Sequence, residues 1–71
     1  MVLTNILSVI VGWEQIRIED TNGNLIYEGA CANFRATTDP DELYKTLTRT
    51  VERVISFTDD NDNSYISITI A

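Results

Sequence analysis

The sequence predicts a single α+β domain over residues 1–71, with a four-stranded, mainly antiparallel sheet made of two hairpins and one or two short helices. Three observations support this fold class. Residues 14–20 and 64–70 alternate polar and apolar side chains with the period of a strand. A polar turn adjoins each of these segments, and Asp39-Pro40 begins a helix between the two hairpins. The predicted order of elements is therefore α-β-β-α-β-β.

The first segment, residues 4–11, is open to two interpretations. As a helix it would be capped by Thr4 or Asn5, would carry Ile6 and Ile10 on one face, and would end at the glycine that follows the apolar run. Ile and Val restrict the χ1 angle and are poor helix formers, so a strand over the same residues is the alternative. We expect the helix.

The first hairpin is predicted from residues 20–23, Asp-Thr-Asn-Gly, which follow the strand over residues 14–20. Asp at the first position and Gly at the fourth suit a type I turn, and Asn-Gly also suits a two-residue type I′ loop. In either case a second strand follows, from Asn24 to about Phe34.

These two turns imply different registers. The two-residue loop sets Ile18 opposite Tyr27 and brings Arg17 opposite Glu28, a favourable charge pair. The type I loop with a bulge sets Ile18 opposite Ile26. A slip of one residue exchanges the two faces of a strand, so the registers give different cores, and the sequence alone leaves both open.

A second helix begins at Asp39, which can accept hydrogen bonds from the first backbone N–H groups of that helix. Pro40 suits the first helical position, because an N–H there would have no partner inside the helix. Asp41 and Glu42 add negative charge to the first turn, and Glu42 completes an Asp-led capping box. The expected inward face consists of Leu43, Tyr44 and Leu47.

The end of this helix is open. Apolar residues continue at helical spacing beyond Leu47, whereas the β-branched residues Thr46, Thr48 and Thr50 favour a sheet. We expect the helix to end near Leu47 and a strand to cover residues 50–58.

The second hairpin joins that strand to residues 64–70 through a polar turn at residues 59–63. In the last strand isoleucines alternate with smaller or more polar side chains, which predicts one apolar and one polar face. The apolar face consists of Ile66, Ile68 and Ile70.

Acidic residues outnumber basic ones in this chain. It has 11 Asp and Glu, 5 Lys and Arg and no His, for a net charge of −6 and a pI near 4.2. This balance favours a partner with a basic surface and argues against direct binding of nucleic acid or of an anionic membrane. Without His, the chain lacks the commonest general base and the commonest metal ligand.

No motif indicates catalysis, a cofactor or a bound metal. Cys31 is the only cysteine and has no His to activate it, so we interpret it as a small buried apolar residue. The acidic turn fails as a calcium loop, since counting from Asp59 the places that need Gly and Glu hold Ser64 and Ile70. We therefore expect no catalytic, cofactor-binding or metal-binding residues and no enzymatic activity.

The candidate partner-binding residues are acidic side chains at the hairpin ends and one exposed aromatic residue. We expect both hairpin ends to lie on one side of the sheet, so that their carboxylates form a single acidic face. Trp13 follows Gly12, and a lone surface Trp is a typical interface anchor. The predicted contact residues are Glu19, Asp20, Glu28, Asp59, Asp60, Asp62 and Trp13.

Several short motifs carry a resemblance that covers nearly the whole chain. They are the Asp-x-Asn-Gly turn, Leu-Ile-Tyr-Glu-Gly at residues 25–29, Asp-Glu-Leu at 41–43, Val51 to Phe57 and the closing Ile-Ser-Ile-Thr-Ile. In these features the chain resembles small orphan proteins encoded by bacteriophages and mobile elements of Gram-positive bacteria. That group has no established activity, so the resemblance implies a phage-like context and fold. In size and charge the chain is also similar to anti-CRISPR and anti-restriction inhibitors.

These features predict a non-enzymatic accessory protein of phage type that acts by binding another protein. Its most concrete form is an inhibitor whose acidic face occupies the nucleic-acid groove of a host defence protein. The alternative is a self-associating structural or regulatory module without nucleic-acid mimicry, since self-association would also stabilise so small a domain. Residues 1–11 are apolar but too short for a membrane span and lack a basic flank and a cleavage site, which predicts a cytoplasmic location.

Overall fold

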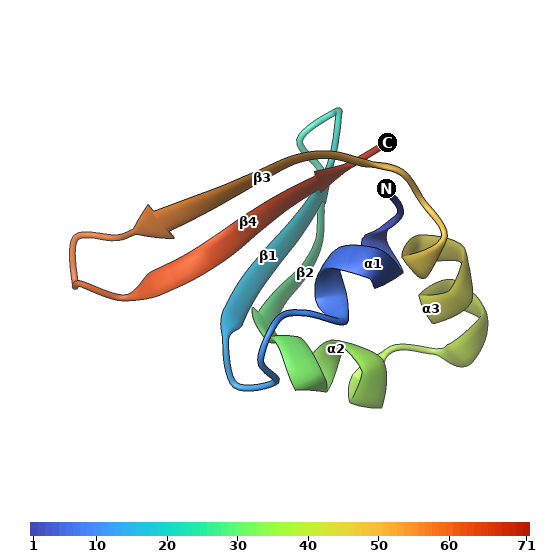
Figure 1. Ribbon diagram of the computed structural model, residues 1–71, viewed down its shortest axis with the longest axis horizontal. Coiled ribbons are helices and arrows are strands. Elements are labelled where there is room, and N and C mark those ends of the chain that lie inside the picture. Colours follow the sequence, from blue (N-terminus) through green and yellow to red (C-terminus); the bar gives the residue numbers. More distant parts are fainter.

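The computed structural model describes residues 1–71 as a four-stranded sheet with three helices on one side of it (Figure 1). The elements in chain order are α1 (Leu3–Leu7), β1 (Gln15–Asp20), β2 (Leu25–Ala30), α2 (Cys31–Thr37), α3 (Pro40–Leu47), β3 (Val51–Thr58) and β4 (Ser64–Ile70). The strands are ordered β2-β1-β4-β3. Both outer pairs are antiparallel, whereas the central pair, β1 and β4, is parallel. The predicted α+β class with a four-stranded sheet of mainly antiparallel strands is confirmed, and the sheet is mixed. The predicted one or two helices and the order α-β-β-α-β-β are wrong, because three helices give the order α-β-β-α-α-β-β.

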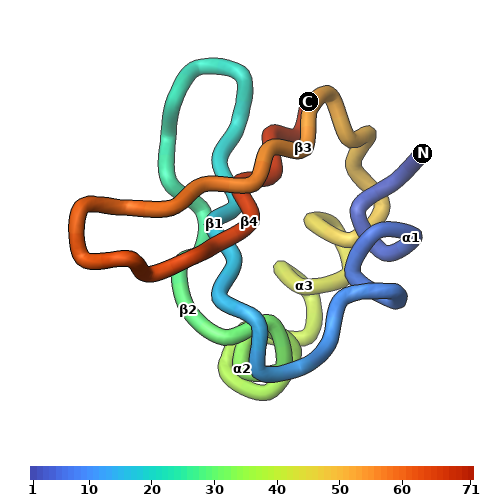
Figure 2. Tube along the Cα trace, turned by 60° about the vertical axis from the view of Figure 1, so that its left-hand side comes forward, coloured from blue at the N-terminus to red at the C-terminus, as the bar shows by residue number.

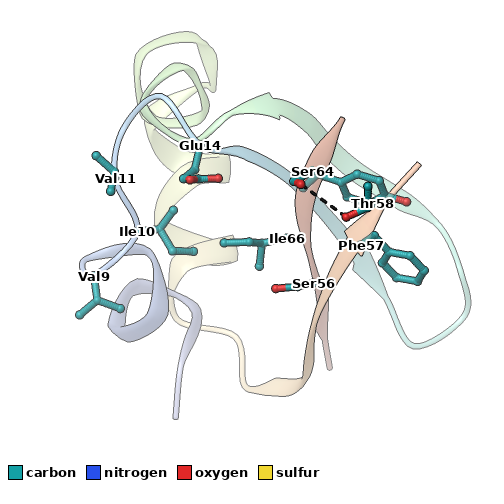
Figure 3. Close-up of a pocket in the computed structure, with 10 residues that line it drawn as sticks. Val9, Ile10, Val11, Glu14, Ser56, Phe57, Thr58, Ser64 and Ile66 are labelled. Carbon is teal, nitrogen blue, oxygen red and sulfur yellow. Dashed lines mark hydrogen bonds between the residues drawn. The ribbon is translucent and has the colours of Figure 1, made fainter. Parts of the chain in front are cut away.

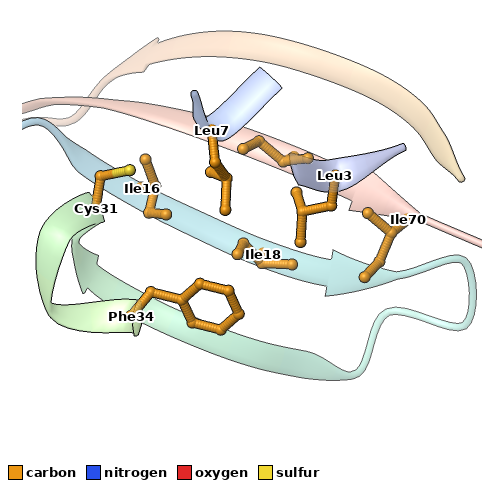
Figure 4. Close-up of a cluster of buried hydrophobic side chains, with 8 residues drawn as sticks. Leu3, Leu7, Ile16, Ile18, Cys31, Phe34 and Ile70 are labelled. Atoms are coloured by element: carbon orange, nitrogen blue, oxygen red, sulfur yellow. The ribbon is translucent and has the colours of Figure 1, made fainter. Parts of the chain in front are cut away.

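The core lies between the helices and the face of the sheet that they cover, here called the inner face. Alternate residues of the two central strands point into it, as the predicted period of two requires. Figure 4 shows these side chains meeting those of α1 and α2. The buried core consists of Leu3, Leu7, Ile16, Ile18, Cys31, Phe34, Ile68 and Ile70. Burial of each large side chain contributes roughly 1.5–3 kcal/mol to folding.

The first segment is a helix, as expected, but it is shorter and begins earlier than predicted. It spans Leu3–Leu7 with Val2 at the N-cap, so the predicted capping of its first N–H groups by Thr4 or Asn5 is wrong. Instead the backbone N–H of Val2 donates to Oδ1 of Asn5 at 3.0 Å. Leu3 and Leu7, four residues apart, form the buried face in place of the predicted isoleucines. Leucine is the better helix former, which explains where the helix settles.

The first hairpin combines features of both predicted alternatives. The N–H of Gly23 donates to the carbonyl of Asp20 at 3.0 Å, and Gly23 has a φ of 83°, as in a type I turn followed by a left-handed residue. The register nevertheless sets Ile18 opposite Tyr27, because the pairing shifts between Ile18 and Glu19 and leaves Ile26 as a bulge. The turn is therefore the predicted type I loop, whereas the register of the core is the one predicted for the two-residue loop.

The prediction that the second strand continues to about Phe34 is wrong. Strand β2 ends at Ala30, and the next residues form α2, an additional helix between the hairpins. This helix has no side-chain cap. The N–H groups of Cys31 and Ala32 donate instead to the carbonyls of Glu14 and Gly12, at 2.8 and 2.9 Å. Its N-terminus is therefore satisfied by a distant loop, which a local motif does not reveal.

The start and the end of α3 are as predicted. Oδ2 of Asp39 accepts the N–H groups of Asp41 and Glu42 at 3.1 and 3.4 Å, and the helix ends at Leu47. The expected inward orientation of Tyr44 is wrong, because this side chain is 72% exposed. Thr46 is buried in its place, with its hydroxyl donating to the carbonyl of Glu42. Strands β3 and β4 match their predicted bounds to within one residue.

The longest helix has eight residues, and no helix is long and apolar enough to cross a membrane.

Candidate functional site

The expectation that the two hairpin ends lie on one side of the sheet is wrong. β1 and β4 are parallel neighbours, with Ile16 opposite Ile66. The turn at residues 20–24 follows the end of β1, whereas the turn at residues 59–63 precedes the start of β4. Parallel alignment therefore places the two turns at opposite ends of the sheet, as Figures 1 and 2 show. The carboxylates of the two turns do not form one acidic face.

Both turns have the same five-residue structure, Asp-x-Asn-x-Asn, at residues 20–24 and 59–63. In each, the first carboxylate accepts the backbone N–H groups of the residues two and four positions later, all at 2.9 Å. The fourth residue has a positive φ, 83° at Gly23 and 62° at Asp62. The aspartate that begins each turn therefore has a structural role, which accounts for two of the predicted contact residues.

The acidic residues near the first turn are held by contacts within the chain. On the outer face of the sheet, opposite the helices, Nε of Arg17 lies 3.9 Å from Oε2 of Glu19 and its Nη1 lies 3.6 Å from Oε2 of Glu28. Hydrogen bonds from the backbone and the side chain of Asn24 hold the pKa of Asp20 below its ordinary value. Contacts with the chain's own groups thus engage all three carboxylates, and this end of the molecule is the weaker candidate for a contact surface.

The β3–β4 turn concentrates uncompensated negative charge. Asp59, Asp60 and Asp62, here called the acidic tip, lie in a turn with no Lys or Arg, at the end of a hairpin that projects beyond the helices (Figure 1). None of the three forms an ion pair. On the outer face a hollow of about 370 Å³ brings Asp59 and Glu28 together, with Gln15, Asn63, Ser64 and Tyr65 completing its lining. Of the six predicted acidic contacts, Glu19 and Asp20 thus lie near the first turn and the three residues of the acidic tip lie at the other end. Glu28, paired with Arg17, lines the hollow beside Asp59.

A second, more apolar hollow of about 480 Å³ lies on the inner face of the same hairpin, between it and the loop before β1. We call it the apolar groove. Figure 3 shows Ile10 and Ile66 pointing toward one another across it, with the carboxylate of Glu14 at its margin. Its lining residues are Val9, Ile10, Val11, Glu14, Ser56, Phe57, Thr58, Ser64, Tyr65 and Ile66. The groove therefore opens beside the acidic tip, with an apolar wall on the loop, hydroxyl groups and Ile66 on the hairpin, and one acidic residue of its own.

Aromatic side chains stiffen the hairpin that carries both features. The rings of Phe57 and Tyr65 stack with their centres 5.4 Å apart and their planes 12° apart. On the opposite face of the hairpin the hydroxyl oxygens of Thr58 and Ser64 lie 3.4 Å apart. Phe57 remains 45% exposed, so it is available to a partner as well as to its neighbour. Such a pair contributes about 0.5–1.5 kcal/mol beyond the burial of its area.

Trp13 lies in the loop that forms one wall of the groove, between Val11 and Glu14. It is 78% exposed, so the prediction of a surface Trp is confirmed. Val9 and Val11 in the same loop are also exposed. The loop therefore presents large apolar side chains to solvent, as protein interfaces commonly do.

The remaining groups with reactive chemistry lie elsewhere and have raised pKa values. Cys31 is buried, as predicted, and burial raises the pKa of its thiol, so the thiol stays protonated at neutral pH. Burial also raises the pKa of Tyr27, whose hydroxyl donates to the carbonyl of Ala30 at 2.6 Å. Nowhere do three Cys, Asp or Glu side chains converge in a way that would hold a metal ion.

The groove was not predicted from the sequence. Its two walls, residues 9–14 and residues 56–66, are far apart in the chain and meet only through the parallel pairing of β1 with β4. One signal was present, however. The apolar run continues from Val9 to Val11 after the helix has ended, and exposed apolar residues gathered in one segment are common at contact surfaces.

Comparisons with protein families, with curated proteins and with solved structures found no match for this chain.

Proposed function

We propose that this chain is a non-enzymatic protein-binding module, and that its site consists of the apolar groove, the acidic tip and Trp13. The observation that carries this proposal is the adjacency of the groove and the tip, and the loop that forms one wall of the groove also carries the exposed Trp13. A groove of about 480 Å³, in which Ile10 and Ile66 face one another, opens beside three carboxylates that form no ion pair. Exposed apolar surface rimmed by charge of one sign is characteristic of a docking site.

The partner that fits this site is a protein segment in which basic residues flank a few apolar ones. The apolar side chains would fill the groove, and each Å² of apolar area that they bury supplies roughly 25 cal/mol. The basic residues would lie against the acidic tip and Glu28, accelerating association and making it sensitive to salt. Nucleic acid is a poor alternative, because phosphate would be repelled by the same carboxylates.

In its most concrete form, the proposed partner is a host defence protein that binds nucleic acid, and the chain inhibits it. The projecting β3–β4 hairpin would enter the basic groove that otherwise holds the phosphate backbone. Support for this form comes from the net charge of −6, the position of the acidic tip and the resemblance to small phage proteins. Inhibition would then be competitive with nucleic acid.

The test uses the tagged chain as bait in host lysate at low salt, with captured proteins identified by mass spectrometry. The double variant Asp60→Asn/Asp62→Asn removes two charges from the acidic tip. Its matched control, Asp41→Asn/Glu42→Gln, removes two charges from α3. For a purified partner the tip variant should weaken affinity about fivefold, since each exposed charge pair contributes roughly 0.5 kcal/mol. The control should bind like the parent chain.

Two results would contradict the proposal. One is a captured set that contains no nucleic-acid-binding protein, which refutes the inhibitor form. The other is an equal affinity for the tip variant and for the α3 control, which removes the acidic tip from the binding site.

A further inference from the structure

The two edges of the sheet differ in how they are protected. Edge strands present unpaired backbone groups, and natural proteins usually shorten, bulge or cover them. The edge strand β2 has six residues and is interrupted by the bulge at Ile26. The other edge, β3, has eight residues, contains no Pro or Lys, and pairs regularly with β4 from Arg53 to Thr58. β3 therefore has the features of an edge that pairs with another strand.

The hydrogen bonds of the hairpin show which backbone groups of β3 are free. The N–H of Asp59 donates to the carbonyl of Asn63 at 3.0 Å, so Asp59 faces β4. In an antiparallel pair, successive residues face alternately toward and away from the partner strand. Thr58, Ser56 and Val54 therefore direct their N–H and C=O groups away from β4. These three residues are here called the free edge.

The beginning of the strand is already covered. The N–H of Val51 donates to the carbonyl of Met1 at 2.9 Å, and Val2 bridges Thr50. The N-terminal residues thus occupy the edge before the pairing shift that lies between Val51 and Arg53. What remains open is the regular part of β3, which is centred on Ser56.

We propose that the free edge binds a second copy of this chain, with the two β3 strands antiparallel and a two-fold axis passing through Ser56. Two β3 residues, one from each copy, can exchange hydrogen bonds only if both face outward. The axis therefore passes either through an outward-facing residue or through the inward-facing residue between two of them. Centring on Ser56 sets it opposite the second copy's Ser56 and sets Val54 opposite the second copy's Thr58. Every residue of the free edge then has a backbone partner.

The side chains support this register. On the outer face Ile55 lies opposite the second copy's Phe57, an aliphatic–aromatic pair of the kind that stabilises antiparallel strands. Arg53 lies opposite the second copy's Asp59, and Arg53 forms no ion pair within its own chain. Shifting the pairing register by two residues in one direction sets Arg53 opposite the second copy's Phe57. Shifting it by two in the other direction sets Asp59 opposite the second copy's Ile55. Both shifts lose the ion pair.

The assembly would be a continuous sheet of strand order β2-β1-β4-β3-β3-β4-β1-β2. Because side chains opposite one another in a sheet point to the same face, the helices of both copies would lie on the same side. The two apolar grooves would flank the axis, since Ser56 and Thr58 line each groove. This inference does not rest on the proposed partner, because it concerns association of the chain with itself.

Cysteine cross-linking tests the register. In Ser56→Cys the two thiols would lie on residues whose Cα atoms are about 5.5 Å apart, within the range that a disulfide spans. In the matched control Val54→Cys the residue is equally on the free edge and is 42% exposed, but its two copies would be roughly 13 Å apart along the strands. Under mild oxidation the first variant should form a covalent dimer and the second should not. Cys31 is buried and should give no background.

Sedimentation equilibrium of the untagged chain tests the association itself. The parent should reach twice its 8.0 kDa mass with rising concentration. Val54→Pro removes an outward-facing N–H without breaking a bond to β4, so it should remain folded and monomeric. Arg53→Glu should weaken the dimer about tenfold by opposing Asp59, whereas Lys45→Glu, the same charge change on α3, should not.

Three results would overturn the inference. A parent chain that stays at 8.0 kDa up to millimolar concentration shows no dimer. A dimer that survives Val54→Pro uses another surface. Equal cross-linking of the two cysteine variants refutes the register, and it does so even if the proline variant fails to fold.

Discussion

The matched turns allow one prediction to be worked out in detail, on the fourth residue of each turn. Gly23 and Asp62 occupy equivalent positions with φ values of 83° and 62°. This left-handed region costs an ordinary L-residue roughly 1–2 kcal/mol, and Asp is partly exempt because its short side chain bonds locally. The two positions should therefore rank substitutions in the same order, with Gly the most stable, Asp next and Ala the least stable.

The magnitude at position 23 follows from the structure. A Cβ added to Gly23 would meet no atom within 4 Å, so no steric clash contributes. The left-handed cost of roughly 1–2 kcal/mol is offset by about 0.4–1 kcal/mol, because Ala restricts the unfolded chain. Gly23→Ala should therefore lower the free energy of unfolding by about 1 kcal/mol, or the melting temperature by roughly 4–8 °C in a domain of this size.

At position 62 the same reasoning predicts that the change to glycine does not destabilise the fold, in contrast to the change from glycine to alanine at position 23. Asp62→Gly should leave the stability unchanged or raise it slightly, and Asp62→Ala should lower it by about 0.5 kcal/mol. Asp62→Asn is the control for charge, since it keeps the local hydrogen-bonding side chain and removes the carboxylate. Urea denaturation followed by circular dichroism measures all four variants.

The reasoning fails if Gly23→Ala costs less than about 0.3 kcal/mol, or if alanine is the most stable residue at either position. It also fails if the double variant Gly23→Ala/Asp62→Gly departs from additivity. The two turns lie at opposite ends of the sheet and share no contacts, so their effects should add within about 0.5 kcal/mol.

Two further predictions concern the first hairpin. Hydrogen bonds from Asn24 lower the folded-state pKa of Asp20 below 3.8, so the stability they contribute is complete above that value and is lost as pH falls through the lower folded pKa. Asp20→Asn should therefore reduce the loss of stability on acidification. A carboxyl NMR titration that finds an unshifted or raised pKa for Asp20 would contradict this. Gly29 has a φ of 150°, and a Cβ there would lie 2.8 Å from Oη of Tyr27. Gly29→Ala should therefore destabilise the fold by about 2 kcal/mol. In thermal denaturation the double variant Gly29→Ala/Tyr27→Phe should lose less stability than the sum of the two single variants. Strict additivity would show that the clash is absent.

Local signals explain how much of the fold could be predicted from the sequence. Asp39 and Pro40 identify the start of α3 because capping involves only neighbouring residues. The alternation of isoleucines identifies β4 for a similar reason. By contrast, α2 was missed because its first N–H groups bind carbonyls of the loop before β1, and the sequence of the helix alone carries no start signal.

The candidate site shows the same division. The exposure of Trp13 and the charge of the turn at residues 59–63 were predicted, since both depend on local sequence. The prediction of a single acidic face was wrong, because the positions of the two turns depend on whether β1 and β4 are parallel or antiparallel. Nothing within either strand specifies that choice. It is determined by the connection through α2 and α3, which carries the chain from the end of the sheet where β2 finishes to the opposite end, where β3 begins.

The central parallel pair has a consequence for the way this chain folds. Each hairpin is local and can form quickly, but an isolated two-stranded hairpin is at best marginally stable in water. The pair that joins them links Ile16 to Ile66, residues near the two ends of the chain, so forming it carries the entropic cost of closing a long loop. Neither half has a complete hydrophobic core without the other. The sheet therefore divides into two rapidly formed units whose docking completes the core, and folding should behave as one slow, cooperative transition.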